Sequence, residues 1–298
     1  MTNQEKFKIS EKLAEYCGMY DSQNKAANSL KNVSPATVSH MLKGAKQYGE
    51  SPETPEAWAK IKAEMWRNVA AQVGCKNDEW VVAETRDFKT LYKLLAYSKE
   101  NSKVSFITGA TGSGKTETIK KFTKENKQVY TLKCNDFWNR KTFLFELLTA
   151  IGEDASGYTM YELMGVIVRK LKEQEAPLLV LDEADKLNDQ LLYFFITLYN
   201  NLEDHCGIIM IATEFLEKRI KKGIRLGKKG YPEIYSRGGK KFIKLNGVGS
   251  TDVRAVCVAN GITEASRIKE IYEDSDHDLR RVKDKIKAYK KLVQGQEA

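Results

Sequence analysis

The chain has 298 residues, of which 30% are charged and 42% hydrophobic, the balance of an ordinary globular protein. This length allows a principal domain and a smaller unit. No apolar run approaches the ~20 residues that a membrane-spanning helix needs. The polar N-terminus is unlike a secretory signal. We therefore expect no membrane partner and a cytoplasmic location.

The cysteines and the net charge restrict the function further. No C-x-x-C pair is present, and the three histidines have no neighbouring ligands, so we expect reduced thiols and no metal site built on cysteine or histidine. The net charge is +9. Such a charge favours a polyanionic partner such as nucleic acid, although a basic protein without such a partner has the same composition.

Residues 1–50 are predicted to form a small helical unit. Its third helix begins at Pro35 behind the cap residue Ser34 and ends at Gly44. Two short helices joined by a tight turn are typical of a helix-turn-helix. A helical bundle that binds protein or has no ligand is the alternative. The exposed residues that would contact DNA are Thr37, Ser39, His40 and Lys43.

Residues 51–83 are predicted to be a helical linker, because glycine, serine and proline gather just before a helix over 56–73. From residue 84 to 249 the pattern alternates between helices and continuous apolar strands. The expected strands are 104–108, 128–132, 177–181 and 207–212. This alternation predicts an α/β core whose parallel sheet is buried on both faces. Residues 250–298 are predicted to form a small C-terminal helical lid.

A phosphate-binding loop follows the first strand. Its sequence fits G-x-x-x-x-G-K-[ST] and is followed by a predicted helix, the context that this motif requires. Backbone N–H groups of such a loop surround the phosphates, and the helix N-terminus adds positive charge. Lys115 would reach the β- and γ-phosphates, and the Thr116 hydroxyl would bind magnesium. The loop consists of Gly109, Ala110, Thr111, Gly112, Ser113, Gly114, Lys115 and Thr116.

Two acidic residues end the apolar strand over 177–181. Asp182 lies at the carboxyl end of the strand, where ligands gather in an open parallel sheet. We expect it to hold Mg²⁺, and we expect Glu183 to polarise the attacking water, because phosphoryl transfer depends on positioning and electrostatics. The sequence therefore predicts ATP and Mg²⁺ as ligands and ATP hydrolysis as the reaction. Asp185 either assists this chemistry or caps the next helix, and we expect the cap.

The stretches G-A-T-G-S-G-K-T and L-L-V-L-D-E-A-D resemble the two nucleotide motifs of the AAA+ ATPases. Within them, the order of the predicted domains resembles the transposition regulators of the phage Mu B protein, TnsC and IstB type. The resemblance implies a three-layer AAA+ core with a parallel sheet, preceded by a helix-turn-helix unit and followed by a helical lid.

The resemblance also suggests three further site residues. Thr213, at the end of a strand, would contact the γ-phosphate or the attacking water. Arg237 would act on the nucleotide of a neighbouring subunit, with Arg219 and Arg225 as alternatives. Asp278-Leu-Arg280 is similar to the D-L-R signature of a lid helix, so Arg280 would touch the nucleotide, with Arg281 as the alternative.

The stretch over 218–244 is more basic than an arginine-finger loop requires. It either lines a DNA channel, where basic side chains bind phosphates regardless of sequence, or forms a solvated face. A second candidate phosphate-contacting segment, 139–142, follows the second strand. The expected DNA contacts in these two segments are Asn139, Arg140, Lys141, Lys221, Lys222 and Arg225.

Taken together, these features predict an ATPase that binds duplex DNA with little sequence preference. It would assemble on DNA as a ring or a helical filament and deliver target DNA to a transposase, which would stimulate hydrolysis. Two alternatives remain. One is a helix-turn-helix transcription regulator with an AAA+ switch domain, and the other is a helicase-loader ATPase.

Overall fold

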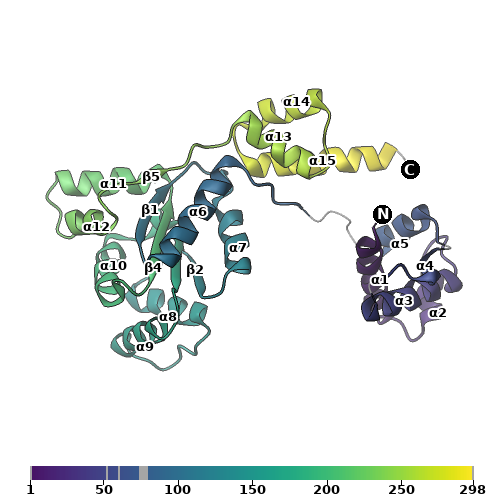
Figure 1. Ribbon diagram of the computed structural model, residues 1–298, viewed down its shortest axis with the longest axis horizontal. Coiled ribbons are helices and arrows are strands. Elements are labelled where there is room, and N and C mark those ends of the chain that lie inside the picture. The colour runs from purple at the N-terminus through teal and green to yellow at the C-terminus, as the bar shows by residue number, and fades with distance from the viewer. Residues whose placement is uncertain (1, 52, 60, 74–79, 297–298) are drawn as a thin grey trace. The chain divides into compact units, whose positions relative to one another are not determined.

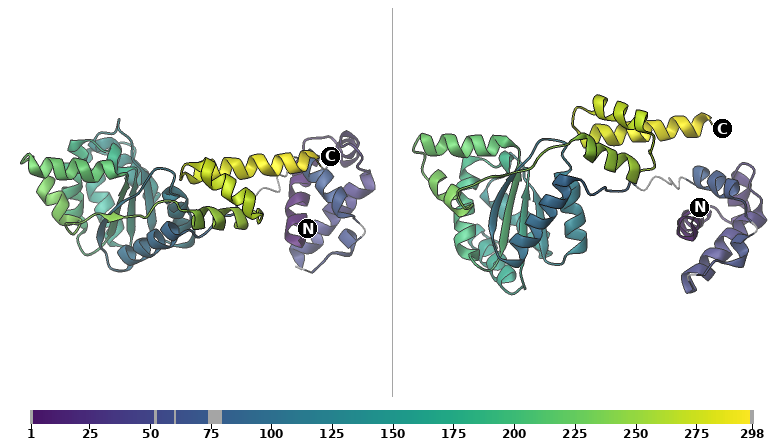
Figure 2. Two further views of the ribbon diagram at one scale, coloured as in Figure 1. Left: turned by 90° about the horizontal axis from the view of Figure 1, so that it is seen from above. Right: turned by 45° about the horizontal axis from the view of Figure 1, so that its top comes forward.

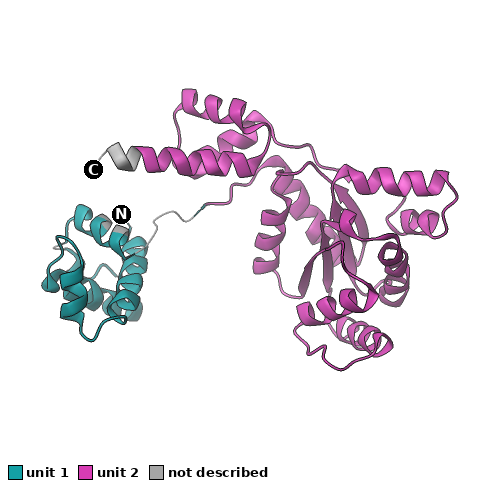
Figure 3. Ribbon diagram, turned by 180° about the vertical axis from the view of Figure 1, so that it is seen from behind, with its two compact units in different colours: residues 1–80 teal, residues 81–298 magenta. Residues whose placement is uncertain are grey.

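The computed structural model describes residues 2–51, 53–59, 61–73 and 80–296. It divides the chain into two compact units, Met1–Trp80 and Val81–Ala298 (Figure 3). The division follows Trp80, so most of the segment predicted as a linker, 51–83, belongs to the first unit. Trp58 and Trp66 explain this, because both indoles are fully buried in that unit's core.

Within its described residues, the first unit consists of helices and their connecting segments, with no strand. Ile9, Leu13 and Met41 pack with the two tryptophans, whose ring centroids lie 5.5 Å apart. The predicted cap is confirmed at Ser34, whose hydroxyl accepts from the backbone N–H of Thr37. The helices are α1 (Asn3–Cys17), α2 (Gln23–Ser29), α3 (Pro35–Glu50), α4 (Glu56–Ala59) and α5 (Ala63–Gln72).

The predicted end of the third helix at Gly44 is wrong, because α3 continues to Glu50. Gly44 makes room for an indole ring instead of ending the helix. A Cβ atom at Gly44 would lie 2.2 Å from Nε1 of Trp58, which donates a hydrogen bond to the carbonyl of Met41. The glycine therefore allows α3 and α4 to approach closely.

The second unit begins with an α/β core (Figure 1). The five strands are parallel in the order β2-β3-β4-β1-β5. The strands are β1 (Val104–Thr108), β2 (Val129–Lys133), β3 (Leu178–Asp182), β4 (Gly207–Ala212) and β5 (Ile243–Lys244). The helices are α6 (Arg86–Glu100), α7 (Lys115–Glu125), α8 (Arg140–Ile151), α9 (Met160–Lys172), α10 (Asp189–Leu202), α11 (Glu214–Arg225) and α12 (Tyr231–Arg237), with a short 3-10 turn at Ala184–Lys186.

Helices cover both faces of this sheet (Figures 1 and 2). Residues of β3 alternate between the faces, as a strand requires. Leu178 and Val180 pack with α6 and α7. Leu179 and Leu181 pack with residues of α8, α9 and α10. The predicted α/β class with a parallel sheet buried on both faces is therefore confirmed. The two-residue strand β5 was not predicted, since two residues are too few for a periodic signal.

As predicted, the described residues after 249 form helices, which make up the lid: α13 (Ser250–Ala259), α14 (Ala265–Ser275) and α15 (Leu279–Gln296). The lid is tied to the start of α6, because the buried carboxylate of Asp252 lies 2.8 Å from the guanidinium of Arg86. Among the described residues, no helix is long and apolar enough to cross a membrane.

Candidate nucleotide-binding site

The phosphate loop connects β1 to α7 at the carboxyl edge of the sheet. Gly112 and Gly114 adopt left-handed backbone conformations, with φ of 75° and 89°. Only glycine adopts such conformations without strain. The buried hydroxyl of Ser113 has no hydrogen-bond partner among the described residues. An unpaired buried hydroxyl is costly, so the loop fits a ligand that carries hydrogen-bond acceptors.

Lys115 lies inside this loop. Its ammonium donates to the carbonyl oxygens of Gly109 at 2.9 Å and Ala110 at 2.7 Å. Burial lowers the pKa of Lys115, because desolvation disfavours the charged form, whereas the negative charge of Asp182 opposes this change. The negative charge of a phosphate bound in the loop would raise the pKa of Lys115, as the charge of Asp182 does.

Thr116 and Asp182 meet across the site. The Thr116 hydroxyl donates to Oδ2 of Asp182 at 2.8 Å, and the N–H of Glu183 donates to Oδ1 at 3.0 Å. Asp182 is only 3% exposed, and burial raises its pKa, although these two hydrogen bonds oppose that shift. A hydroxyl and a carboxylate side by side are hard oxygen ligands of the kind that Mg²⁺ prefers.

No group of three or more His, Cys, Asp or Glu side chains suited to a metal ion occurs in the described ranges. A site with one carboxylate and one hydroxyl fits magnesium that also binds substrate phosphates, which is the usual arrangement in nucleotide enzymes.

Glu183 is held by two lysines. Its carboxylate lies 2.6 Å from the ammonium of Lys186 and 3.3 Å from that of Lys133. The pKa of Glu183 is lowered, chiefly by the hydrogen bond from Lys186, with Lys133 adding to the effect. The residue also has a φ of 57°, which is uncommon for a side chain of this size. Glu183 is therefore an ionised carboxylate that is engaged with its own chain. Neither lysine was singled out from the sequence.

Thr213 directly follows β4, next to the turn after β3. Its hydroxyl donates to Oδ2 of Asp185 at 2.9 Å. The structure thus brings Thr213 to the acidic turn that follows Asp182. Asp185, which the sequence assigned to a helix cap, is the partner of Thr213, and Asn188 caps α10 instead, accepting from the N–H of Leu191.

The candidate arginine fingers differ in their contacts. Arg237 lies 3.6 Å from Glu233 and 3.9 Å from Glu203, and its guanidinium lies 4.8 Å from the ring centre of Tyr199. Its Nε is buried without a hydrogen-bond partner among the described residues. Tyr199 belongs to α10, Glu233 belongs to α12, and Glu203 lies between α10 and β4. None of these contacts involves the phosphate loop, so the structure does not bring Arg237 to the phosphate loop of its own chain.

Of the two alternatives, Arg219 is committed to its own fold. It contacts Asp189 and donates to the carbonyl of Leu187 at 2.6 Å. Arg225 is exposed and forms no ion pair within the part of the chain that the structure describes.

The lid reaches the phosphate loop at the start of α15. The N–H of Leu279 donates to the carbonyl of Gly112 at 2.9 Å. A Cβ atom at Gly112 would lie 2.2 Å from the carboxyl group of Asp278, so this acid lies directly over the loop. The charge of Arg280 is among those that lower the pKa of Lys115, whereas Arg281 pairs with Asp276 at 3.6 Å. Arg281 is thus paired within the lid, whereas Arg280 forms no ion pair with a described residue.

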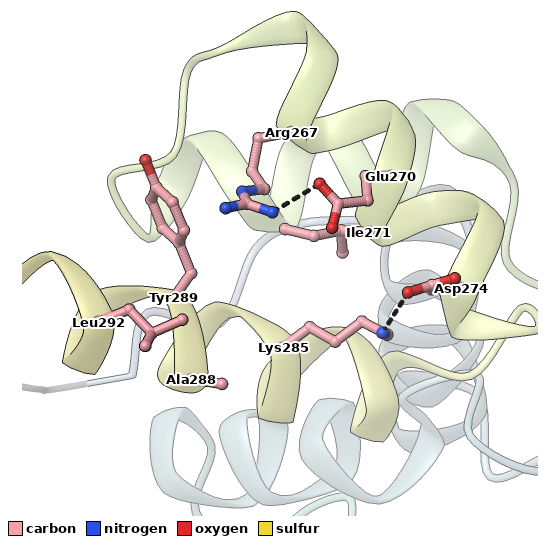
Figure 4. A pocket seen from close by; sticks show the side chains of 8 residues that line it. All are labelled: Arg267, Glu270, Ile271, Asp274, Lys285, Ala288, Tyr289 and Leu292. Carbon is pink, nitrogen blue, oxygen red and sulfur yellow. Dashed lines mark hydrogen bonds and ion pairs between the residues drawn. The ribbon is translucent and has the colours of Figure 1, made fainter.

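Contacts between α14 and α15 hold the lid together (Figure 4). Lys285 lies 2.6 Å from Asp274, and the guanidinium of Arg267 lies 4.5 Å from the ring centre of Tyr289. These residues line a surface groove. The charged side chains of the groove are paired with one another, so these contacts serve to pack α15 against α14. The first residues of α15 touch the phosphate loop.

The predicted DNA contacts occupy three separate elements. Thr37, Ser39 and Lys43 lie on α3, and the Thr37 hydroxyl is hydrogen-bonded to that of Ser34. Asn139 is the cap of α8, and its side-chain oxygen accepts from the N–H of Thr142. Its amide oxygen is thus already used.

The remaining predicted DNA contacts are basic side chains that differ in whether they form an ion pair. On α11, Lys221 is paired with Glu217 at 2.6 Å. The remaining cations are exposed and form no ion pair with a described residue: Arg140, Lys141, Lys222 and Arg225.

Residues 98–220 match the family model described as an AAA domain. The match covers the α/β core from the end of α6 into α11. A curated relative, the Mu-like prophage FluMu DNA transposition protein B of Haemophilus influenzae, is 24% identical over 201 residues, which cover 66% of this chain and 68% of the relative. The resemblance to AAA+ ATPases of the transposition-regulator type is thereby confirmed, and the AAA domain supports nucleotide binding and hydrolysis as its activity.

Two solved structures align with this chain at low identity and with TM-scores below 0.5. The Drosophila ORC bound to DNA is 16% identical with a TM-score of 0.45, covering 68% of this chain and 55% of that one. NtrX from Brucella abortus is 14% identical with a TM-score of 0.47, covering 82% of this chain and 60% of that one. The chain thus spans a little over half the length of these structures.

Proposed function

We propose that this chain is an ATPase that assembles on duplex DNA when ATP is bound and presents that DNA to a transposase. The observation that carries the proposal is that Lys115, Thr116 and the buried Asp182 lie together at the phosphate loop, inside the segment that matches an AAA domain. A second support is the curated relative, whose name describes a DNA transposition protein.

Thr116 and Asp182 would hold the magnesium ion together with phosphate oxygens, and the ion would supply charge neutralisation at the β- and γ-phosphates. Lys115 would bind the same phosphates from inside the loop. Glu183 would orient and polarise the attacking water. Because Glu183 is paired with Lys133 and Lys186, it has to leave these lysines before it can act on water.

Two residues outside this cluster would complete the site. Thr213 would bond the γ-phosphate or the water, after exchanging its hydrogen bond with Asp185. Arg280 would contact the phosphates from the lid. We propose that Arg237 acts on the nucleotide of the neighbouring subunit, because its described contacts lie with Tyr199, Glu203 and Glu233 of its own chain. ATP would then join two subunits.

Affinity for DNA would come mainly from the unpaired cations on α8 and α11. Contacts to phosphates release counterions and carry no sequence information. Binding should therefore depend steeply on salt and little on sequence. Lys222→Ala and Arg225→Ala should each make the slope of log K against log[salt] shallower by about 0.9. Lys221→Ala should change it less, because Lys221 already pairs with Glu217.

The test of the whole proposal is the size of the protein with and without its ligands. Light scattering coupled to gel filtration should show a large assembly with ATP and duplex DNA together, and a smaller species when either is left out. A chain that remains monomeric with both present would contradict the proposal.

The exposed residues Ser39 and Lys43 on α3 favour a second function, a transcription regulator whose N-terminal unit reads a specific sequence. Footprinting separates the two functions. A short protected site that appears on genomic DNA and disappears in the Lys43→Ala variant would favour the regulator. Extended protection of any DNA would favour the transposition function.

A further inference from the structure

The loop between β2 and α8 exposes an aromatic ring beside unpaired charge. Phe137 is 74% exposed, although burying such a ring would normally stabilise the fold. The neighbouring Trp138 is buried and packs edge-on against Phe143, with ring centroids 6.3 Å apart. One ring of the pair is thus an anchor, and the other points into solvent.

The loop that carries Phe137 is fixed at both ends. At its start, the N–H of Cys134 donates to the carbonyl of Asp182 at 2.8 Å. At its end, the side-chain amide of Asn188 donates to the carbonyl of Trp138 at 3.2 Å, and Asn139 caps α8. A ring held on such a loop loses little conformational freedom on binding, which favours affinity.

The charge around Phe137 favours DNA over a protein partner. Arg140 and Lys141 begin α8, are exposed and form no ion pair with a described residue. The first turn of α8 contains no acidic residue, so its N-terminal N–H groups add positive charge. Tyr161, which is 88% exposed, lies by contrast at the start of α9 next to the acidic Glu162. The Phe137 loop therefore combines an exposed apolar ring with two exposed cations, Arg140 and Lys141, against the one carboxylate of Asp136, a balance that suits a phosphate backbone.

We propose that Phe137 inserts its ring between adjacent base pairs of the bound duplex and bends it, while Arg140 and Lys141 bind the flanking phosphates. Apolar side chains that enter a base step unstack it and kink the helix, and the bend allows more of the protein to contact the DNA. This inference rests on the proposed binding of duplex DNA and adds the residue that deforms it.

The variants are Phe137→Ala and, as a matched control, Tyr161→Ala, which removes an exposed aromatic ring from acidic surroundings. Both positions are exposed, so thermal melting should show both variants folded. The probes are a duplex with 2-aminopurine, which brightens when its base unstacks, and a duplex labelled at both ends for distance measurement. ATP is present throughout.

We expect the wild-type chain and Tyr161→Ala to brighten 2-aminopurine and to bring the duplex ends closer. Phe137→Ala should do neither and should bind about fivefold to a hundredfold more weakly, the range for loss of one stacking contact. Its salt slope should be unchanged, whereas Arg140→Ala should make the slope shallower by about 0.9. Wild-type protein should prefer a duplex with one mismatch, which opens more easily, and Phe137→Ala should lose this preference.

Each other outcome overturns the inference. If Phe137→Ala binds and bends the duplex like the wild type, the ring is not a wedge, and the proposed function stands. If it impairs assembly without DNA, or transposase stimulation alone, the ring belongs to a protein interface. If the wild-type chain does not bind duplex DNA with ATP, both the inference and the proposed function are wrong.

Discussion

The carboxyl group of Asp278, in the lid, lies directly over Gly112 of the phosphate loop, with 2.2 Å between it and the place of a Cβ atom. The loop carbonyl at Gly112 also accepts from the N–H of Leu279 at 2.9 Å. The lid and the phosphate loop are therefore in direct contact. A ligand that changes the conformation of the loop therefore also changes the position of the lid, and a movement of the lid changes the loop.

Gly112→Ala should damage both nucleotide binding and the lid contact. The new methyl group would meet the Asp278 carboxyl, and the φ of 75° is strained for alanine. We expect ATP affinity to fall at least tenfold in a filter-binding or calorimetric titration. The control is Gly157→Ala, which has a φ of 78° but no atom within 4 Å. It should lose about 1–2 kcal/mol of stability and keep its ATP affinity. Equal effects of the two variants on ATP would show that strain alone matters.

Asp182→Asn should separate magnesium dependence from folding. Burial raises the pKa of Asp182 above its unfolded value of 3.8. The ionised carboxylate therefore lowers the free energy of unfolding of the nucleotide-free protein. This loss of stability begins as the pH rises through the pKa of the unfolded chain and is complete once the pH exceeds the higher pKa of the folded protein. The amide has no such penalty, so melting at neutral pH without nucleotide should show no loss of stability.

Binding measurements then test the role of Asp182. Magnesium should tighten ATP binding by the wild-type chain, and chelation should reverse the effect. Asp182→Asn should bind ATP with nearly the same affinity with and without magnesium. A variant that responds to the metal like the wild type would remove Asp182 from the proposed ligand set.

Lys133→Ala should release Glu183 in part, because it removes the ion pair at 3.3 Å and leaves Lys186 at 2.6 Å. We expect ATP hydrolysis without DNA to rise several-fold, and the double variant with Lys186→Ala to be faster still. Lys120→Ala, which removes an exposed ion pair with Glu117, is the control and should leave the rate unchanged. A slower Lys133→Ala enzyme would mean that the lysine assists the reaction directly.

The motifs that the sequence predicted are local. Gly109–Thr116 and Asp182–Glu183 are short runs with fixed spacing, next to strands whose apolar character is also local. The parallel sheet follows from alternating strands and helices. The pairing of Lys133 with Glu183 was not predictable in this way, because it joins the ends of two strands fifty residues apart, and only the sheet register brings them together.

Close approach between distant segments explains the other differences. The low helix propensity of glycine suggested that a helix ends at Gly44. In the structure α3 continues past it, and the glycine instead leaves room for the Trp58 indole. In the same way, Asp278 belonged to a recognised D-L-R run, but its position over Gly112 depends on the packing of α13, α14 and α15. Local pattern predicts which residues form elements, and tertiary contact decides which of them meet.

Arg237 gives the last prediction, because its role depends on a second subunit. Arg237→Ala should bind ATP like the wild type as an isolated chain, since none of its described contacts involves the phosphate loop. In the assembled state on DNA, its hydrolysis rate should fall by about 10³-fold or more, the usual effect of losing an arginine that acts in trans.

Mixing two inactive variants tests this directly. Lys115→Ala keeps its arginine and lacks a working phosphate loop, whereas Arg237→Ala has the opposite defect. In mixed assemblies, some interfaces combine the intact loop of one chain with the intact arginine of the other, so part of the activity should return. The same mixture with Arg225→Ala as the second variant identifies the alternative finger. If every mixture is as inactive as its components, hydrolysis does not need an arginine from a neighbouring subunit, and each chain carries a complete site.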